Sequence, residues 1–92
     1  MANEIIRFNL RFTNRLDSAR TVVLEPWTGE YVLGAGVQLD IAVKGTPTTP
    51  LEVELDGSRI IITGFDTTDS LLTAYRDGVE LRSEHKQLRP KS

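Results

Sequence analysis

Residues 51–63 read LEVELDGSRIIIT, two runs of β-favouring residues on either side of a turn dipeptide. Asp56 and Gly57 both tolerate a positive φ, which the two central residues of a type I′ hairpin turn require. A two-residue loop at this place puts Glu54 opposite Arg59 and aligns the apolar side chains of both runs on the other face. The segment therefore predicts a β-hairpin with one apolar and one charged face.

Two further segments alternate between apolar and polar residues with a period of two. They are Ile6–Thr13 and residues 37–44, and in both every second residue is apolar, beginning with the first. Strict alternation is typical of a strand with one buried and one solvated face. Shorter apolar runs at residues 21–25 and 30–33 add two strands, and the proline- and threonine-rich residues 45–50 predict a loop.

The segment Leu71–Arg76 fits two different structures. Asp77-Gly78 is a second hairpin dipeptide, which would make this segment a strand and pair Tyr75 with Glu80. The alternative is a short helix that begins at a capping residue before the segment and ends at Gly78. Both structures stay open at the level of the sequence.

Turn signals recur about every 8 to 12 residues, a spacing that predicts an all-β chain. The expected architecture is an antiparallel β-sandwich of about seven or eight short strands, immunoglobulin-like in outline, with a small open β-barrel as the alternative. Residues 1–82 are expected to form a single sandwich domain, because 92 residues supply one core. Residues 83–92 are polar, contain Pro90 and are expected to form a flexible C-terminal tail.

The formal charge of −2 is unevenly distributed, with basic ends and an acidic centre. The N-terminal arginines lack the interleaved aromatic residues of a nucleic-acid-binding surface, so a nucleic-acid partner is disfavoured. Arg7 and Arg11 fit a charged strand face that discourages edge-to-edge aggregation better than they fit an anion site. No stretch approaches the roughly 20 consecutive apolar residues of a membrane-spanning helix. We therefore expect a soluble, cytoplasmic protein with no membrane partner.

The residue types that build most catalytic and metal sites are scarce in this chain. It has no cysteine, and its single histidine, His85, lies in the polar C-terminal segment. No metal ion, cofactor or catalytic residue is therefore assigned. A hydrolase built on Asp40, Glu52 and Glu54 is the least favoured hypothesis, because acidic residues at alternate strand positions usually form a solvated face. The oxygen-rich residues 66–70 are assigned to turn hydrogen bonds rather than to calcium binding.

The single tryptophan lies in the most distinctive stretch of the chain, Glu25-Pro26-Trp27-Thr28-Gly29-Glu30-Tyr31. An aromatic ring between carboxylates can stack on a sugar or a cationic group. The candidate ligand or partner surface therefore consists of Glu25, Trp27, Glu30 and Tyr31. The alternative is that Trp27 closes one end of the sandwich, since tryptophan is highly buried on average.

This stretch resembles a pattern in a group of short bacterial all-β proteins that have no assigned function. The pattern is Glu-Pro-Trp followed by Glu-Tyr-x-Leu-x-x-Gly, and it corresponds to residues 25–36. In that group a glycine directly follows the tryptophan, whereas Thr28 follows Trp27 here. The resemblance implies a bacterial all-β protein and transfers no catalytic residue.

Three classes of function are compatible with these observations. The leading expectation is a non-enzymatic module that binds a protein partner or a second copy of itself, since a small sheet protein with free edges most readily acts by edge pairing. A carbohydrate- or small-ligand-binding domain that uses the Trp27 loop is the alternative, with a glycan as its ligand. The carboxylate-dependent hydrolase comes third.

Overall fold

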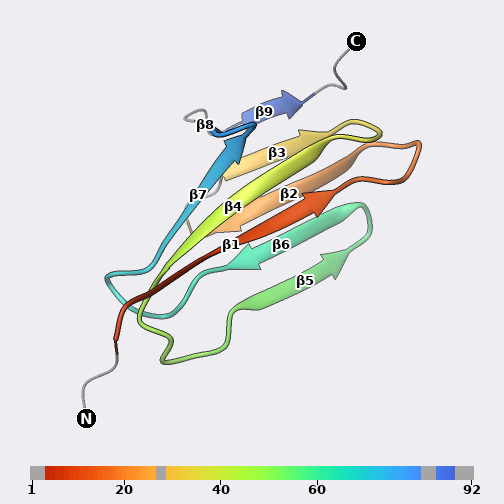
Figure 1. The fold of residues 1–92 in the computed structure, drawn as a ribbon. Helices are drawn as coiled ribbons and strands as arrows, with labels where there is room; N and C mark the ends of the chain where they lie inside the picture. Colours follow the sequence, from red (N-terminus) through yellow and green to blue (C-terminus); the bar gives the residue numbers. More distant parts are fainter. Residues whose placement is uncertain (1–3, 27–28, 82–84, 89–92) are drawn as a thin grey trace.

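The computed structural model describes residues 4–26, 29–81 and 85–88. These residues form strands and loops, and none of them belongs to a helix that is long and apolar enough to cross a bilayer. Figure 1 shows the strands, which in chain order are β1 (Ile6–Thr13), β2 (Arg20–Glu25), β3 (Gly29–Leu33), β4 (Gln38–Gly45), β5 (Glu52–Asp56), β6 (Arg59–Thr63), β7 (Leu71–Arg76), β8 (Val79–Glu80) and β9 (His85–Leu88).

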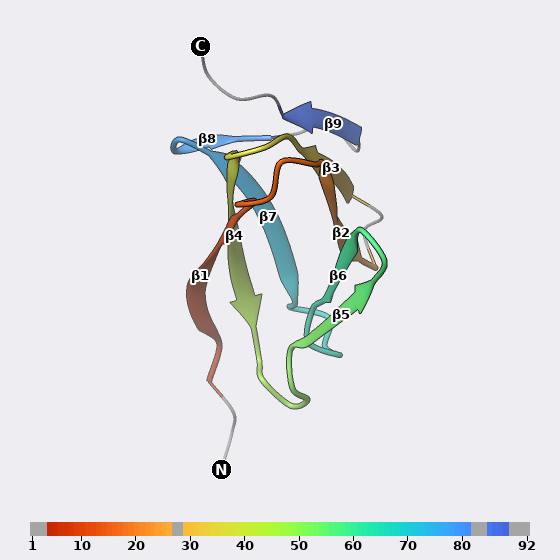
Figure 2. The same ribbon diagram turned by 90° about the vertical axis from the view of Figure 1, so that its right-hand side faces the viewer.

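The strands form two sheets that pack face to face (Figure 2). Sheet A has the order β1-β4-β7-β8, and sheet B has the order β5-β6-β2-β3-β9. The predicted all-β fold class is confirmed, and the arrangement in two separate layers is that of a sandwich rather than of the barrel considered as its alternative.

The core lies between the two sheets and is centred on β4. Leu39, Ile41 and Val43 are almost completely buried and alternate along β4 with outward-facing residues, as the period of two predicted. Other strands contribute Val22 and Leu24 of β2, Tyr31 and Leu33 of β3, Ile62 of β6, Leu72 and Ala74 of β7, and Leu88 of β9, and the loop residues Val37 and Phe65 complete the core.

Two strand pairs are parallel, which differs from the purely antiparallel sandwich that was expected. β2 pairs in parallel with β6, and β3 pairs in parallel with β9. The three consecutive residues Val22, Val23 and Leu24 are all buried, so that both faces of β2 are covered. Burial on both faces is typical of strands with parallel partners.

The C-terminal segment was expected to be a flexible tail, but His85–Leu88 forms β9 at the edge of sheet B. Leu88 is buried in the core, and its carbonyl oxygen accepts a hydrogen bond of 2.8 Å from the backbone N–H of Gly34. Residues 85–88 thus form a strand that pairs with β3, contrary to the expectation, while residues 83, 84 and 89–92 of the expected tail lie outside the described residues.

The hairpin of β5 and β6 exists, but its register differs from the prediction. Asp56 lies opposite Arg59, and Glu54 lies opposite Ile61 rather than Arg59. Gly57 has a φ of 60° and Asp56 has no positive φ, so Gly57 and Ser58 are the central residues of a type II′ turn. Because the pairing shifts by two residues, the apolar side chains still share one face.

The second hairpin has the predicted register. Leu71–Arg76 is the strand β7, which excludes the helical alternative, and Tyr75 lies opposite Glu80. The turn residues Asp77 and Gly78 have φ values of 52° and 80°, as a type I′ turn requires.

Candidate functional site

The structure separates Tyr31 from the other described residues of the predicted Trp27 surface. Tyr31 is only 5% exposed and belongs to the core, whereas its neighbour Glu30 lies on the outer face of sheet B. Burial raises the pKa of the Tyr31 hydroxyl, and the carboxylate of Glu80 raises it further. Glu25 is half-buried at the end of β2, and Trp27 lies outside the described residues. Tyr31 therefore acts as a core residue and offers no stacking surface.

The structure also separates Asp40 from the other two carboxylates of the hydrolase hypothesis. Asp40 is on the outer face of sheet A, where it accepts hydrogen bonds from Arg11 Nε at 2.8 Å and Arg11 Nη2 at 3.3 Å. Glu52 and Glu54 alternate with the inward-facing residues of β5 and lie on the outer face of sheet B. The core separates them from Asp40, so a catalytic pair that includes Asp40 does not form. In the described ranges no three histidine, aspartate or glutamate side chains gather as metal ligands.

The oxygen-rich loop after β6 is built from hydrogen bonds within the chain. Asp69 Oδ2 accepts a hydrogen bond from Thr46 Oγ1, and Asp69 Oδ1 accepts bonds from the Thr46 backbone N–H at 3.1 Å and from Thr67 Oγ1. The hydroxyl and backbone donors of Thr46 and Thr67 lower the pKa of Asp69 to about 2. The carboxylate thus fastens this loop to the end of β4, in agreement with the turn chemistry predicted for residues 66–70.

The lowered pKa of Asp69 makes a pH dependence of stability testable. The stabilisation by the Asp69 carboxylate is complete above the ordinary aspartate pKa of about 4 and is lost as the pH falls toward 2. We expect Asp69→Asn to melt at a lower temperature than the wild type at pH 7 and to lose less of its Tm between pH 4 and pH 2. Thermal unfolding followed by circular dichroism across this range measures the difference.

The matched control for this prediction is Asp66→Asn. The Asp66 side chain is exposed in the same loop and accepts no hydrogen bond from the described residues. Its removal should leave the acid dependence of the wild type intact. Parallel acid profiles for the wild type and Asp69→Asn would show that the Asp69 carboxylate does not stabilise the fold.

One long side of the sandwich leaves apolar side chains uncovered. β1 and β5 are the edge strands of their sheets on this side, and their inward-facing residues include Ile6, Phe8, Val53 and Leu55. The exposed fractions are 38% for Ile6, 37% for Phe8, 49% for Val53 and 80% for Leu55. We call these four residues the open edge.

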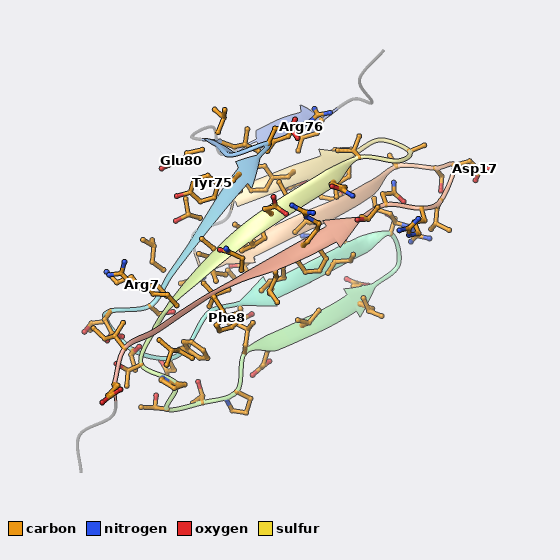
Figure 3. The ribbon with its side chains drawn as sticks, in the orientation of Figure 1. Arg7, Phe8, Asp17, Tyr75, Arg76 and Glu80 are labelled. Carbon is orange, nitrogen blue, oxygen red and sulfur yellow. The ribbon has the colours of Figure 1, made fainter. Side chains whose placement is uncertain are left out.

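The open edge is an extension of the core rather than part of the solvated faces. Leu10 and Phe12 follow Phe8 on the same face of β1 and pack against the core. In Figure 3 the neighbouring residues Arg7 and Phe8 project to opposite sides of β1. The open edge is therefore a solvent-accessible continuation of the core along this side of the sandwich.

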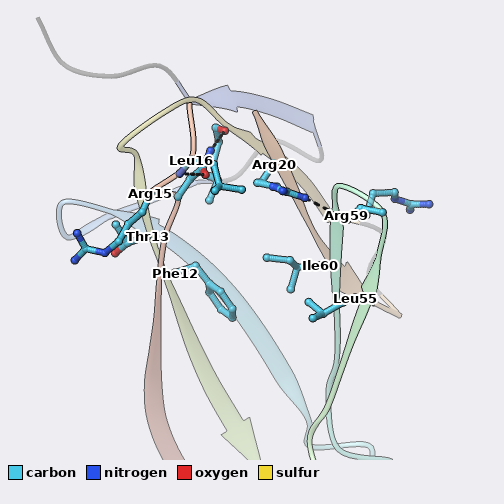
Figure 4. Close-up of a pocket in the computed structure, with 11 residues that line it drawn as sticks. Phe12, Thr13, Arg15, Leu16, Arg20, Leu55, Arg59 and Ile60 are labelled. Atoms are coloured by element: carbon cyan, nitrogen blue, oxygen red, sulfur yellow. Dashed lines mark hydrogen bonds between the residues drawn. The ribbon is translucent and has the colours of Figure 1, made fainter. Parts of the chain in front are cut away.

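A pocket of about 450 Å³ occupies one end of the open edge (Figure 4). Phe12 of β1, Leu55 of β5 and Ile60 of β6 form its apolar wall. The Arg20 side chain lies across the mouth, where Nη1 donates a hydrogen bond of 3.2 Å to the carbonyl oxygen of Gly57. Arg59 lines the pocket too, but its guanidinium points away from it. The pocket therefore suits an apolar side chain better than a charged ligand.

Asn14 fixes the loop that forms the upper wall of this pocket. Its side-chain amide donates hydrogen bonds to the carbonyl oxygens of Ser18 at 2.9 Å, Leu33 at 3.0 Å and Gly34 at 3.2 Å. Asn14 Oδ1 accepts a bond of 3.1 Å from the backbone N–H of Leu16. One buried side chain thus holds the connection between β1 and β2 against the end of β3.

Sequence reasoning identified the side chains of the open edge but assigned all of them to the interior. The apolar alternation of β1 and β5 predicts burial, and only the sheet topology shows that both strands lie at an edge where part of this face stays uncovered. Comparison of the chain with protein-family models, with curated proteins and with solved structures finds no match.

Proposed function

We propose that this protein is a non-enzymatic interaction module that binds an extended segment of a partner along the open edge. The observation that carries the proposal is the exposure of inward-facing apolar residues on both β1 and β5. An edge strand presents unpaired backbone N–H and C=O groups, to which an added strand forms hydrogen bonds. The alternate side chains of that strand would then enter the space between the two sheets.

The open edge lacks three of the devices that commonly prevent such pairing. Natural edge strands are often protected by an inward-pointing charge, a proline or a bulge. The inward-facing positions of β1 and β5 are apolar, and β1 pairs with β4 over eight residues without a bulge. The charged residues of both strands face outward, where they leave the inner surface accessible.

The double variant Phe8→Lys/Leu55→Lys tests this proposal by placing inward-pointing charges on both edge strands. Both side chains are already partly exposed, so the fold should tolerate them. The probes are two octapeptides, one of alternating valine and glutamate and one of alternating valine and lysine. We expect a bound peptide to slow the hydrogen exchange of β1 or β5 amides at least tenfold in the wild type and to have no effect on the double variant.

Val79→Lys is the matched control. Val79 is 66% exposed on β8, at the far end of sheet A from β1, so a lysine there should leave peptide binding unchanged. Equal protection in the wild type and the double variant would contradict the proposal. The proposal would also be contradicted if neither peptide slowed the exchange of the wild-type β1 and β5 amides and the exchange rates did not change with protein concentration.

A further inference from the structure

We infer that the partner at the open edge is a second copy of this chain, with β1 of each copy pairing with β5 of the other. This inference rests on the proposed function and names its partner. It is carried by the charges on the outward-facing sides of the two edge strands, which are of opposite sign.

β1 carries the positive charges. Its outward-facing residues include Arg7 and Arg11, and Arg11 is bonded to Asp40 on the neighbouring strand β4. Arg7 has a different neighbour, because it lies directly opposite Lys44 of β4. Like charges directly opposite each other destabilise a sheet. An acidic strand added beside β1 would offset this repulsion.

β5 is such an acidic strand. Its outward-facing residues are Glu52, Glu54 and Asp56, and its inward-facing residues Val53 and Leu55 are apolar. Glu52 and Glu54 lie opposite the uncharged residues Thr63 and Ile61 of β6. A basic strand on the free side of β5 would therefore supply these two carboxylates with cross-strand partners of opposite charge.

Strand direction allows two symmetric ways to join the open edges. Within one copy β1 and β5 run in the same direction (Figure 1), since β1 leads into the oppositely directed β2, β6 is parallel to β2, and β5 is antiparallel to β6. A two-fold axis along the strands places β1 beside β5 of the other copy in a parallel pair. An axis perpendicular to the sheets places β1 beside β1 and β5 beside β5.

Charge selects the first arrangement. The perpendicular axis brings arginines against arginines and glutamates against glutamates, whereas the axis along the strands brings basic β1 against acidic β5 at both seams. Sheet A of each copy then continues into sheet B of the other copy. The open edges of the two copies meet in one shared core, which removes Phe8 and Leu55 from water.

A charge-swap series tests the inference by measuring the dissociation constant of the dimer in sedimentation experiments. The wild type should reach twice the 10.3 kDa chain mass. Arg7→Glu alone and Glu52→Lys/Glu54→Lys alone should each weaken the dimer at least tenfold. The dissociation constant of the combined variant Arg7→Glu/Glu52→Lys/Glu54→Lys should lie within threefold of the wild-type value, because both seams then regain opposite charges. Asp66→Lys, an exposed loop change outside these strands, should leave the dimer unchanged.

Three results would overturn the inference, and they affect the proposed function differently. A wild type that stays monomeric while its edge amides are protected by a peptide would refute the second copy and leave the binding edge in place. If Phe8→Lys/Leu55→Lys disrupts the dimer but neither Arg7→Glu nor Glu52→Lys/Glu54→Lys weakens it, the pairing of β1 with β5 is refuted and the open edge remains the interface. A dimer that Phe8→Lys/Leu55→Lys leaves intact would place the interface elsewhere.

Discussion

Replacement of Asn14 by aspartate is expected to destabilise the protein by about 3 kcal/mol at pH 7, a large fraction of the stability of a domain of this size. Asn14 is 5% exposed, and its side-chain amide donates to three carbonyl oxygens. A carboxylate has no hydrogen to donate, so its oxygen would face these carbonyl oxygens in a buried site. Asn14→Ala should cost less, about 2 kcal/mol, because it removes the donors without adding a charge.

The destabilisation by Asn14→Asp combines the loss of hydrogen bonds with the burial of a charge, and the pH dependence and a control variant separate the two effects. Protonation of the introduced carboxyl restores one donor, so the difference between Asn14→Asp and Asn14→Ala should narrow as the pH falls from 7 to 5. Gln38→Glu adds the same charge at an exposed position of β4 and should change stability by no more than about 0.5 kcal/mol. Urea unfolding at a fixed protein concentration measures all three variants. Equal stabilities of Asn14→Asp and Gln38→Glu would show that the Asn14 hydrogen bonds do not hold the loop.

Gly45→Ala is expected to destabilise the protein by about 3 kcal/mol, because strain and steric contact act together. Gly45 ends β4 with a φ of 150°, a conformation that residues with a side chain rarely adopt. A Cβ atom there would lie 3.0 Å from Ser70 Cα and 3.1 Å from Phe65 Cδ2. The contact with Ser70 is to the backbone, so the loop as a whole would have to move.

Gly36→Ala is the matched control for Gly45→Ala. Gly36 has a φ of 76°, but a Cβ atom at this position would meet no atom within 4 Å. Its substitution should therefore cost about 1 kcal/mol from backbone strain alone. Urea unfolding of the two variants compares these values. Equal losses would show that the loop yields to the added methyl group without resistance.

Local patterns predicted the strands well and their partners less well. The bounds of β1 agree with the alternation of Ile6–Thr13, because one face of that strand meets the core and the other meets solvent. The β5–β6 register was missed because Gly57-Ser58 competes with Asp56-Gly57 for the turn, and both choices keep the apolar residues on one face. The parallel partners of β2 and β3 lie far along the chain, and no local pattern encodes them.

The candidate site shows the same division between local and global information. Glu30 and Tyr31 are consecutive strand residues, so the period of two places their side chains on opposite faces of the sheet. The prediction that both belong to one surface did not take this alternation into account. The open edge depends on which strands end each sheet. This is a property of the topology, and the alternation of apolar residues in β1 and β5 predicts burial whether or not a neighbouring strand supplies it.

The two parallel pairs have a consequence for the order in which the molecule can assemble. β2 cannot pair with β6, nor β3 with β9, until the later strand of each pair has left the ribosome, and β9 is the last of these strands in the chain. Pairings between distant segments slow folding, since the entropy of closing a long loop is lost before any contact compensates for it. The β1–β4 and β4–β7 pairs of sheet A can form before β9 is available. We therefore expect a nascent chain that acquires one layer of its structure first and exposes the unpaired side of β3 until its final strand emerges.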